Sequence, residues 1–217
     1  MNNQNNIKTE WIQSYIEEVN PIIMTDPLLE LLGQTNKPIP YTYEEVVKFS
    51  GHSCGAVAGA WGITSRALKE LYPNGIPVRG RIKVSAPGAE DESVIGVIGE
   101  VITFITGAAP KTGFHGGGFG EAYRRRNLME YRENEDNSKK EMIWFFERID
   151  TGDKVSVKYN MSKIKPASSP EFSEMGSKVA SGEATLTETE KWIEHWNARA
   201  KFTLDNIDSD LFTVEVI

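Results

Sequence analysis

Two residues suited to metal chemistry are separated by a single residue in the first third of the chain. They are His52 and Cys54, within the segment Phe49-Ser50-Gly51-His52-Ser53-Cys54-Gly55. The segment holds the only cysteine of the chain and one of its three histidines. Thiolate sulfur and imidazole nitrogen are good ligands for a borderline-soft metal ion. We therefore interpret His52 and Cys54 as candidate metal ligands.

The surrounding sequence predicts that Cys54 lies at the start of a helix. A glycine-broken turn precedes it, and apolar residues then follow at helical spacing over about residues 55–71. The unpaired amide groups and the dipole at a helix N-terminus favour an anion such as a thiolate. A thiolate is both a metal ligand and a nucleophile. The competing interpretation is that Cys54 is a buried, unreactive, small apolar side chain.

Composition limits the class of protein. The chain has 217 residues, 39% hydrophobic and 25% charged, which suits one globular domain with a core. A formal net charge of −7 argues against a general nucleic-acid or anionic-membrane binder. One cysteine excludes an internal disulfide framework. The polar N-terminus carries no apolar signal region and no run of 18 apolar residues occurs, so we expect a cytoplasmic protein.

The pattern of apolar residues predicts helices and strands along most of the chain. Helices are expected over residues 7–19, 55–71, 94–105, 170–181 and 187–204. Strands are expected over residues 79–86, 142–148, 154–159 and 210–216. Thr187-Glu188-Thr189-Glu190 resembles a capping box. The glycine-rich segment 106–120 is expected to be irregular, and it lacks the spacing and context of a nucleotide-binding loop.

In this order of elements the chain resembles the FmdE-like family, a family of proteins related to formylmethanofuran dehydrogenase. Three places carry the resemblance over roughly residues 40–217. The first is Gly51-His52-Ser53-Cys54-Gly55, similar to the family's Gly-His-x-Cys-Pro-Gly. The second is the block from Glu90 to Gly107, and the third is the tail Leu211-Phe212-Thr213-Val214-Glu215-Val216.

The resemblance implies both a fold and a site. It implies an α+β fold with a mixed sheet covered by helices, similar to the C-terminal domain of glyceraldehyde phosphate dehydrogenases. It also implies a homodimer, and metal binding, usually zinc, near the His-x-Cys motif. We accordingly divide the chain into an N-terminal helical extension, residues 1–40, and an FmdE-like domain, residues 41–217.

The chain also departs from the family pattern. Gly55-Ala56 replaces Pro-Gly, Ala108 replaces a cysteine, and the C-terminal zinc ribbon of some members is absent. A second thiolate ligand is therefore missing. His115, on the glycine-rich loop, is the candidate third ligand, from the same chain or from a partner. The loop 108–137 is long enough to reach a partner chain.

Three classes of function follow from these observations. The leading hypothesis is a metal-binding protein with zinc or another divalent transition metal on His52, Cys54 and His115, and an open position for water or substrate. No reaction, substrate or catalytic residue is assigned. The second is a metal-free enzyme with Cys54 as nucleophile. The third is a protein that binds a small ligand or a partner through its aromatic residues Trp61, Phe114, Phe119, Trp144, Trp192 and Trp196.

Overall fold

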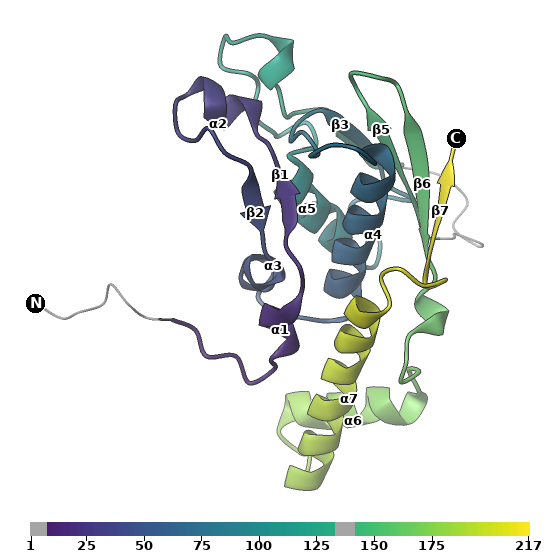
Figure 1. Cartoon of the computed structure of the whole chain (residues 1–217). Coiled ribbons are helices and arrows are strands. Elements are labelled where there is room, and N and C mark those ends of the chain that lie inside the picture. The colour runs from purple at the N-terminus through teal and green to yellow at the C-terminus, as the bar shows by residue number, and fades with distance from the viewer. Residues whose placement is uncertain (1–7, 133–141) are drawn as a thin grey trace, which may run out of the picture.

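Helix α4 (Gly55–Leu71) is the central element of the fold. The structure, a computed structural model, describes residues 8–132 and 142–217. Twelve of the 17 residues of α4 are buried. The helix packs against α5 (Ile95–Thr106), α7 (Leu186–Asp205) and three strands of the main sheet (Figure 1).

The main sheet has five strands in the order β4-β3-β5-β6-β7. They are β3 (Ile82–Ser85), β4 (Met129–Glu130), β5 (Ile143–Arg148), β6 (Lys154–Tyr159) and β7 (Phe212–Val216). Strands β3 and β4 are parallel, and the other neighbours are antiparallel. The fold is thus α+β with a mixed sheet packed against helices, which confirms the expected fold class.

Two glycines let α4 lie close against the sheet. A Cβ atom at Gly59 would lie 2.2 Å from the ring of Tyr159, and one at Gly62 would lie 2.3 Å from the ring of Phe212. Those two rings stack with centroids 4.8 Å apart. The small residues that weaken the intrinsic helix propensity of α4 are therefore the ones that its packing requires.

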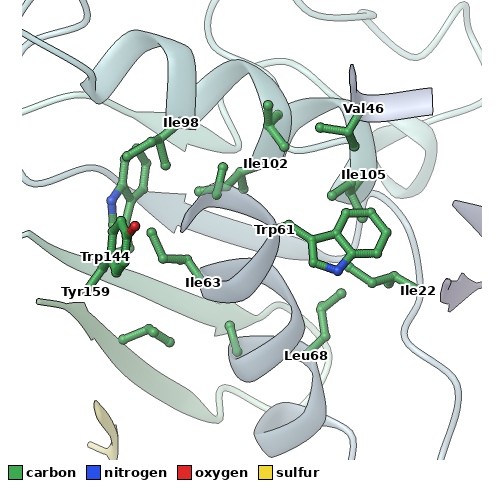
Figure 2. Packing of buried hydrophobic residues seen from close by; sticks show 14 of the residues in the cluster. Ile22, Val46, Trp61, Ile63, Leu68, Ile98, Ile102, Ile105, Trp144 and Tyr159 are labelled. Carbon is green, nitrogen blue, oxygen red and sulfur yellow. The ribbon is translucent and has the colours of Figure 1, made fainter. Parts of the chain in front are cut away.

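Side chains of α4 enter the core on two sides (Figure 2). Ile63 points toward Trp144 and Tyr159, whereas Trp61 lies beside Ile105 and Ile22 (Figure 2). Each of these side chains is buried. The core therefore surrounds α4 and joins the sheet to the N-terminal segment.

The N-terminal segment is less helical than predicted. It contains α1 (Tyr15–Glu18), β1 (Ile22–Met24), α2 (Pro27–Leu31), β2 (Ile39–Tyr41) and α3 (Tyr43–Ser50), and β1 pairs antiparallel with β2. The helix predicted over residues 7–19 is wrong for residues 8–14. Ile12 is 96% exposed, so no packing stabilises that part, and a helix this short is marginal without packing.

The C-terminal helices form a hairpin of α6 (Pro170–Ser181) and α7, which follows the short 3-10 helix η4 (Met161–Lys163). The capping box of α7 lies two residues earlier than predicted. Thr185 Oγ1 accepts from the Glu188 amide at 3.2 Å, and the Glu188 carboxylate accepts from the Thr185 amide at 2.8 Å.

The glycine-rich segment is irregular, as predicted, and leads to the 3-10 helix η2 (Glu121–Tyr123). Part of the long loop predicted over residues 108–137, from residue 133 onward, lies outside the described residues.

Among the described residues, no helix combines the length and the apolar character needed to cross a membrane.

Candidate metal and thiol site at the start of helix α4

The connection between α3 and α4 positions His52, Ser53 and Cys54. Helix α3 begins at a capping box of Thr42 and Glu45 and ends at Gly51, whose φ of +73° gives a left-handed C-cap. The chain is extended at Cys54, the N-cap of α4, with φ −152° and ψ 177°. The prediction that a glycine turn leads into a helix beginning near Cys54 is confirmed.

Ser53 anchors this connection to the core. Its side chain is buried, and its Oγ lies 2.8 Å from the hydroxyl of Tyr43 and accepts from the Tyr15 hydroxyl at 3.1 Å. Its carbonyl oxygen accepts from Trp196 Nε1 at 2.8 Å. Burial raises the pKa of both tyrosines, so their hydroxyls remain protonated donors at neutral pH. The sequence pattern gives no sign of this role, because the partners of Ser53 come from distant segments.

His52 is exposed and has a defined ring orientation. Its Nδ1 lies 3.0 Å from the carbonyl oxygen of Ser50. Because a carbonyl oxygen only accepts, Nδ1 is the donor, and in the neutral ring Nε2 then keeps its lone pair. Metal-bound histidines commonly donate their second ring N–H to a backbone carbonyl in this way.

Cys54 carries a free thiol that is neither fully buried nor fully exposed. Its side chain forms no capping hydrogen bond, although it lies at the N-terminus of a 17-residue helix. Nearby, the Tyr159 hydroxyl donates to the carbonyl oxygen of Gly55 at 2.7 Å, and burial raises the pKa of Tyr159. The first turn of α4 is thus held by a neutral phenol, with the thiol beside it.

His115 lies elsewhere in the same chain. It belongs to the segment between α5 and η2. That teal segment lies at the end of the molecule opposite the start of α4 (Figure 1). Its Nδ1 lies 3.1 Å from Nη1 of Arg126, and because a guanidinium only donates, this Nδ1 must accept. A metal bound through Nδ1 would therefore displace this hydrogen bond, whereas Nε2 carries the proton while the bond persists.

The three predicted ligands are not brought together within one chain. In residues 8–132 and 142–217, no group of three His, Cys, Asp or Glu side chains is placed to hold a metal ion. His52 and Cys54 lie near each other by sequence, and His115 lies apart. A site completed by His115 of a second copy stays a prediction.

The aromatic residues proposed to line one pocket lie in three regions. Trp61 and Trp144 belong to the core, and Phe114 and Phe119 are 44% and 47% exposed on the glycine-rich loop. The indoles of Trp192 and Trp196, both on α7, lie 5.1 Å apart. These six side chains do not line a common pocket.

No family model matches the chain, and a search of curated proteins gives no significant match. The function is therefore argued from the residues and their geometry.

Proposed function

We propose that this chain is an FmdE-like protein that binds zinc, or another divalent transition metal, through His52 Nε2 and Cys54 Sγ. The observation that carries the proposal is the hydrogen bond between His52 Nδ1 and the Ser50 carbonyl oxygen, at 3.0 Å. It leaves Nε2 as the unprotonated donor, as metal binding requires.

The backbone supports the same pair of donors. The two donors lie on either side of Ser53, just before the first turn of α4. Ser53, between the two donors, points into the core, where Tyr15 and Tyr43 contact its hydroxyl. His52 is exposed, whereas Cys54 is half-buried and packs against the core, so a metal bound by both would lie at the boundary between core and solvent. Imidazole plus thiolate is a donor set that suits zinc.

Two donors do not complete a tetrahedral site. Water, a substrate atom or His115 of a second copy would fill the other positions, so the proposal includes a homodimer. A bound zinc ion with an open position would polarise a carbonyl group or acidify a bound water. The proposal also places the protein in the cytoplasm, where reducing conditions keep a single cysteine available as a thiol.

Metal content and cobalt spectroscopy test the proposal. We expect protein purified without a histidine tag to bind about one zinc ion per His-x-Cys motif, and Cys54→Ser and His52→Ala to lose it. Cobalt-substituted protein should show a thiolate-to-cobalt absorption band that is absent from Cys54→Ser. His115→Ala tests the third ligand. Wild-type protein that takes up neither metal would refute the proposal.

The position of Cys54 at the N-terminus of α4 favours one alternative, a metal-free thiol enzyme. Alkylation distinguishes the two functions. A metal ligand should be alkylated slowly when zinc is present and quickly after its removal. A free nucleophile should be alkylated at the same high rate in both conditions.

A further inference from the structure

A hollow of about 410 Å³ lies beside α4, away from the glycine-rich loop. Its walls come from α1 and the turn that follows it, from α4, and from the end of α7. Ligand pockets in proteins have volumes of roughly 300–1,000 Å³. Its lining includes Glu18, Ile22, Trp61, Ser65, Arg66 and Lys69.

Trp61 contributes a hydrogen-bond donor to the lining of this hollow. Its side chain is 1% exposed, and its indole nitrogen, which has no hydrogen-bond partner among the described residues, is not one of the fully buried unpaired atoms. Figure 2 shows the indole nitrogen on the edge of the ring beside Ile22, which also lines the hollow. An indole N–H only donates, so this group can donate to solvent or to an acceptor on a bound molecule.

The donors of α4 form a row along the hollow. Trp61, Ser65 and Lys69 follow one another at intervals of four residues, so they share one face of the helix. Arg66 Nη1 and Lys69 Nζ both contact the same carboxylate oxygen of Asp208, each at 2.8 Å. One carboxylate therefore faces two cations, and this wall keeps an excess of positive charge.

The opposite wall carries negative charge and apolar surface. Glu18, at the C-terminal end of α1, forms no hydrogen bond or ion pair with another described residue, although its charge acts on Lys201. Asp205, the other acid near it, is paired with Lys201 at 2.7 Å. Ile22 and Leu204 add apolar surface to the lining of the hollow.

We propose that this hollow binds a small zwitterion with an apolar body, namely a free apolar α-amino acid. Its carboxylate accepts from Arg66, Lys69 and the Trp61 indole, and its ammonium group faces Glu18. Its side chain lies against Ile22 and Leu204. This site is separate from the proposed metal site and does not depend on it.

Titration calorimetry on metal-free, full-length protein tests the proposal with L-leucine as the probe. Two analogues each lack one charge: 3-methylbutylamine has no carboxylate, and 4-methylpentanoate has no ammonium group. We expect leucine to bind at millimolar concentration or below and each analogue to bind at least about tenfold more weakly. No binding of leucine, or equal binding of either analogue, would overturn the proposal.

Matched variants locate the site. Glu18→Gln and Arg66→Met should each weaken leucine binding about tenfold. Glu17→Gln and Lys48→Met change charges outside the hollow and should leave binding unchanged. Trp61→Phe keeps a ring but removes the N–H, and it should also weaken binding, with its fold checked by thermal melting. Binding that is equal in Glu18→Gln, Arg66→Met and the two controls would exclude this hollow.

Discussion

At the scale of single residues, Asp26 has the most constrained environment. It is 2% exposed, and its carboxylate contacts the guanidinium groups of Arg79 and Arg125. Arg79 also donates to the carbonyl oxygens of Phe104 and Ile105 at the end of α5. One buried carboxylate therefore connects the N-terminal segment to α5 and to the segment after the glycine-rich loop.

We predict that Asp26→Asn destabilises the fold strongly. The amide has the same shape but leaves two guanidinium groups without a counter-charge, so the free energy of unfolding should fall by about 3–5 kcal/mol. Urea denaturation measures the change. Asp210→Asn removes the partner of exposed Lys163, at 2.5 Å, and should cost only about 0–1 kcal/mol. Equal costs in the two variants would contradict this interpretation.

The fold perturbs the titration of His195. Its ring stacks on Phe172 with centroids 3.9 Å apart, and its Nε2 is buried without a partner among the described residues. Burial, and then the charge of Arg199, lower the pKa of His195 below its ordinary value. The folded state therefore favours the neutral ring, and this contribution to stability is lost as the pH falls through the lowered pKa.

We predict that NMR titration of the three histidines gives His195 a midpoint below the ordinary value of about 6.5. His52→Ala and His115→Ala assign the other two signals. Arg199→Gln removes the nearby positive charge and should move the His195 midpoint upward. A His195 midpoint at or above the ordinary value would show that burial does not control this ring.

At the scale of elements, long periodic segments could be predicted from the sequence and short strands could not. The apolar repeat of α5 predicted its ends to within one residue, although its β-branched residues favour strands. Strands β1, β2 and β4 have only two or three residues each, and they depend on pairing with distant segments. No local pattern indicates such pairing.

In the candidate site, too, the features set by local sequence could be predicted, and those set by distant segments could not. The turn that leads into α4 was predicted, because glycine and helical spacing are local signals. The role of Ser53 was not, because Tyr15 lies 38 residues before it and Trp196 lies 143 residues after it. His115 was proposed as the third ligand because it could replace a cysteine that the family has and this chain lacks. The teal segment between α5 and η2 lies at the end of the molecule opposite the start of α4 (Figure 1).

The capping of α7 gives a sharp test of element boundaries. Thr185, rather than Thr187, caps the helix, so Thr185→Ala should reduce the free energy of unfolding by about 0.5–2 kcal/mol. Thr187 is exposed within the first turn, and Thr187→Ala should be neutral or slightly stabilising. Urea denaturation compares them. A larger cost for Thr187→Ala would return the N-cap to the position expected from the sequence.

Contact between α4 and the sheet gives a second test at this scale. Gly59→Ala raises helix propensity, yet its methyl group would overlap the Tyr159 ring, so we expect a net loss of about 1–3 kcal/mol in thermal or urea denaturation. Gly55→Ala is the matched control in the same helix, because its nearest neighbour is the end of the Ile164 side chain at 3.3 Å. If Gly59→Ala were more stable than wild type, α4 would lie farther from the sheet.

At the scale of the whole molecule, burial is unevenly distributed. The core surrounds α4, whereas the hairpin of α6 and α7 extends from the body (Figure 1). Helix α6 has no buried residue, and the buried residues of α7 are Ala200, Thr203 and Leu204, near its end. The outer part of the hairpin therefore contributes little to the shared core.

This distribution predicts the order of amide hydrogen exchange. Amides of residues 55–71 should exchange slowest, through global unfolding, and those of residues 170–195 should exchange earlier, through local opening. Mass spectrometry of peptides from these segments measures both exchange rates over a dilution series.

The concentration dependence separates a monomer from a dimer. In a monomer the exchange rate of the hairpin should not depend on protein concentration. A hairpin that becomes as protected as α4 only at high concentration would mean that a second copy covers it, as the proposed homodimer allows. Equal protection at every dilution would contradict the prediction, because the hairpin would then unfold only with the core.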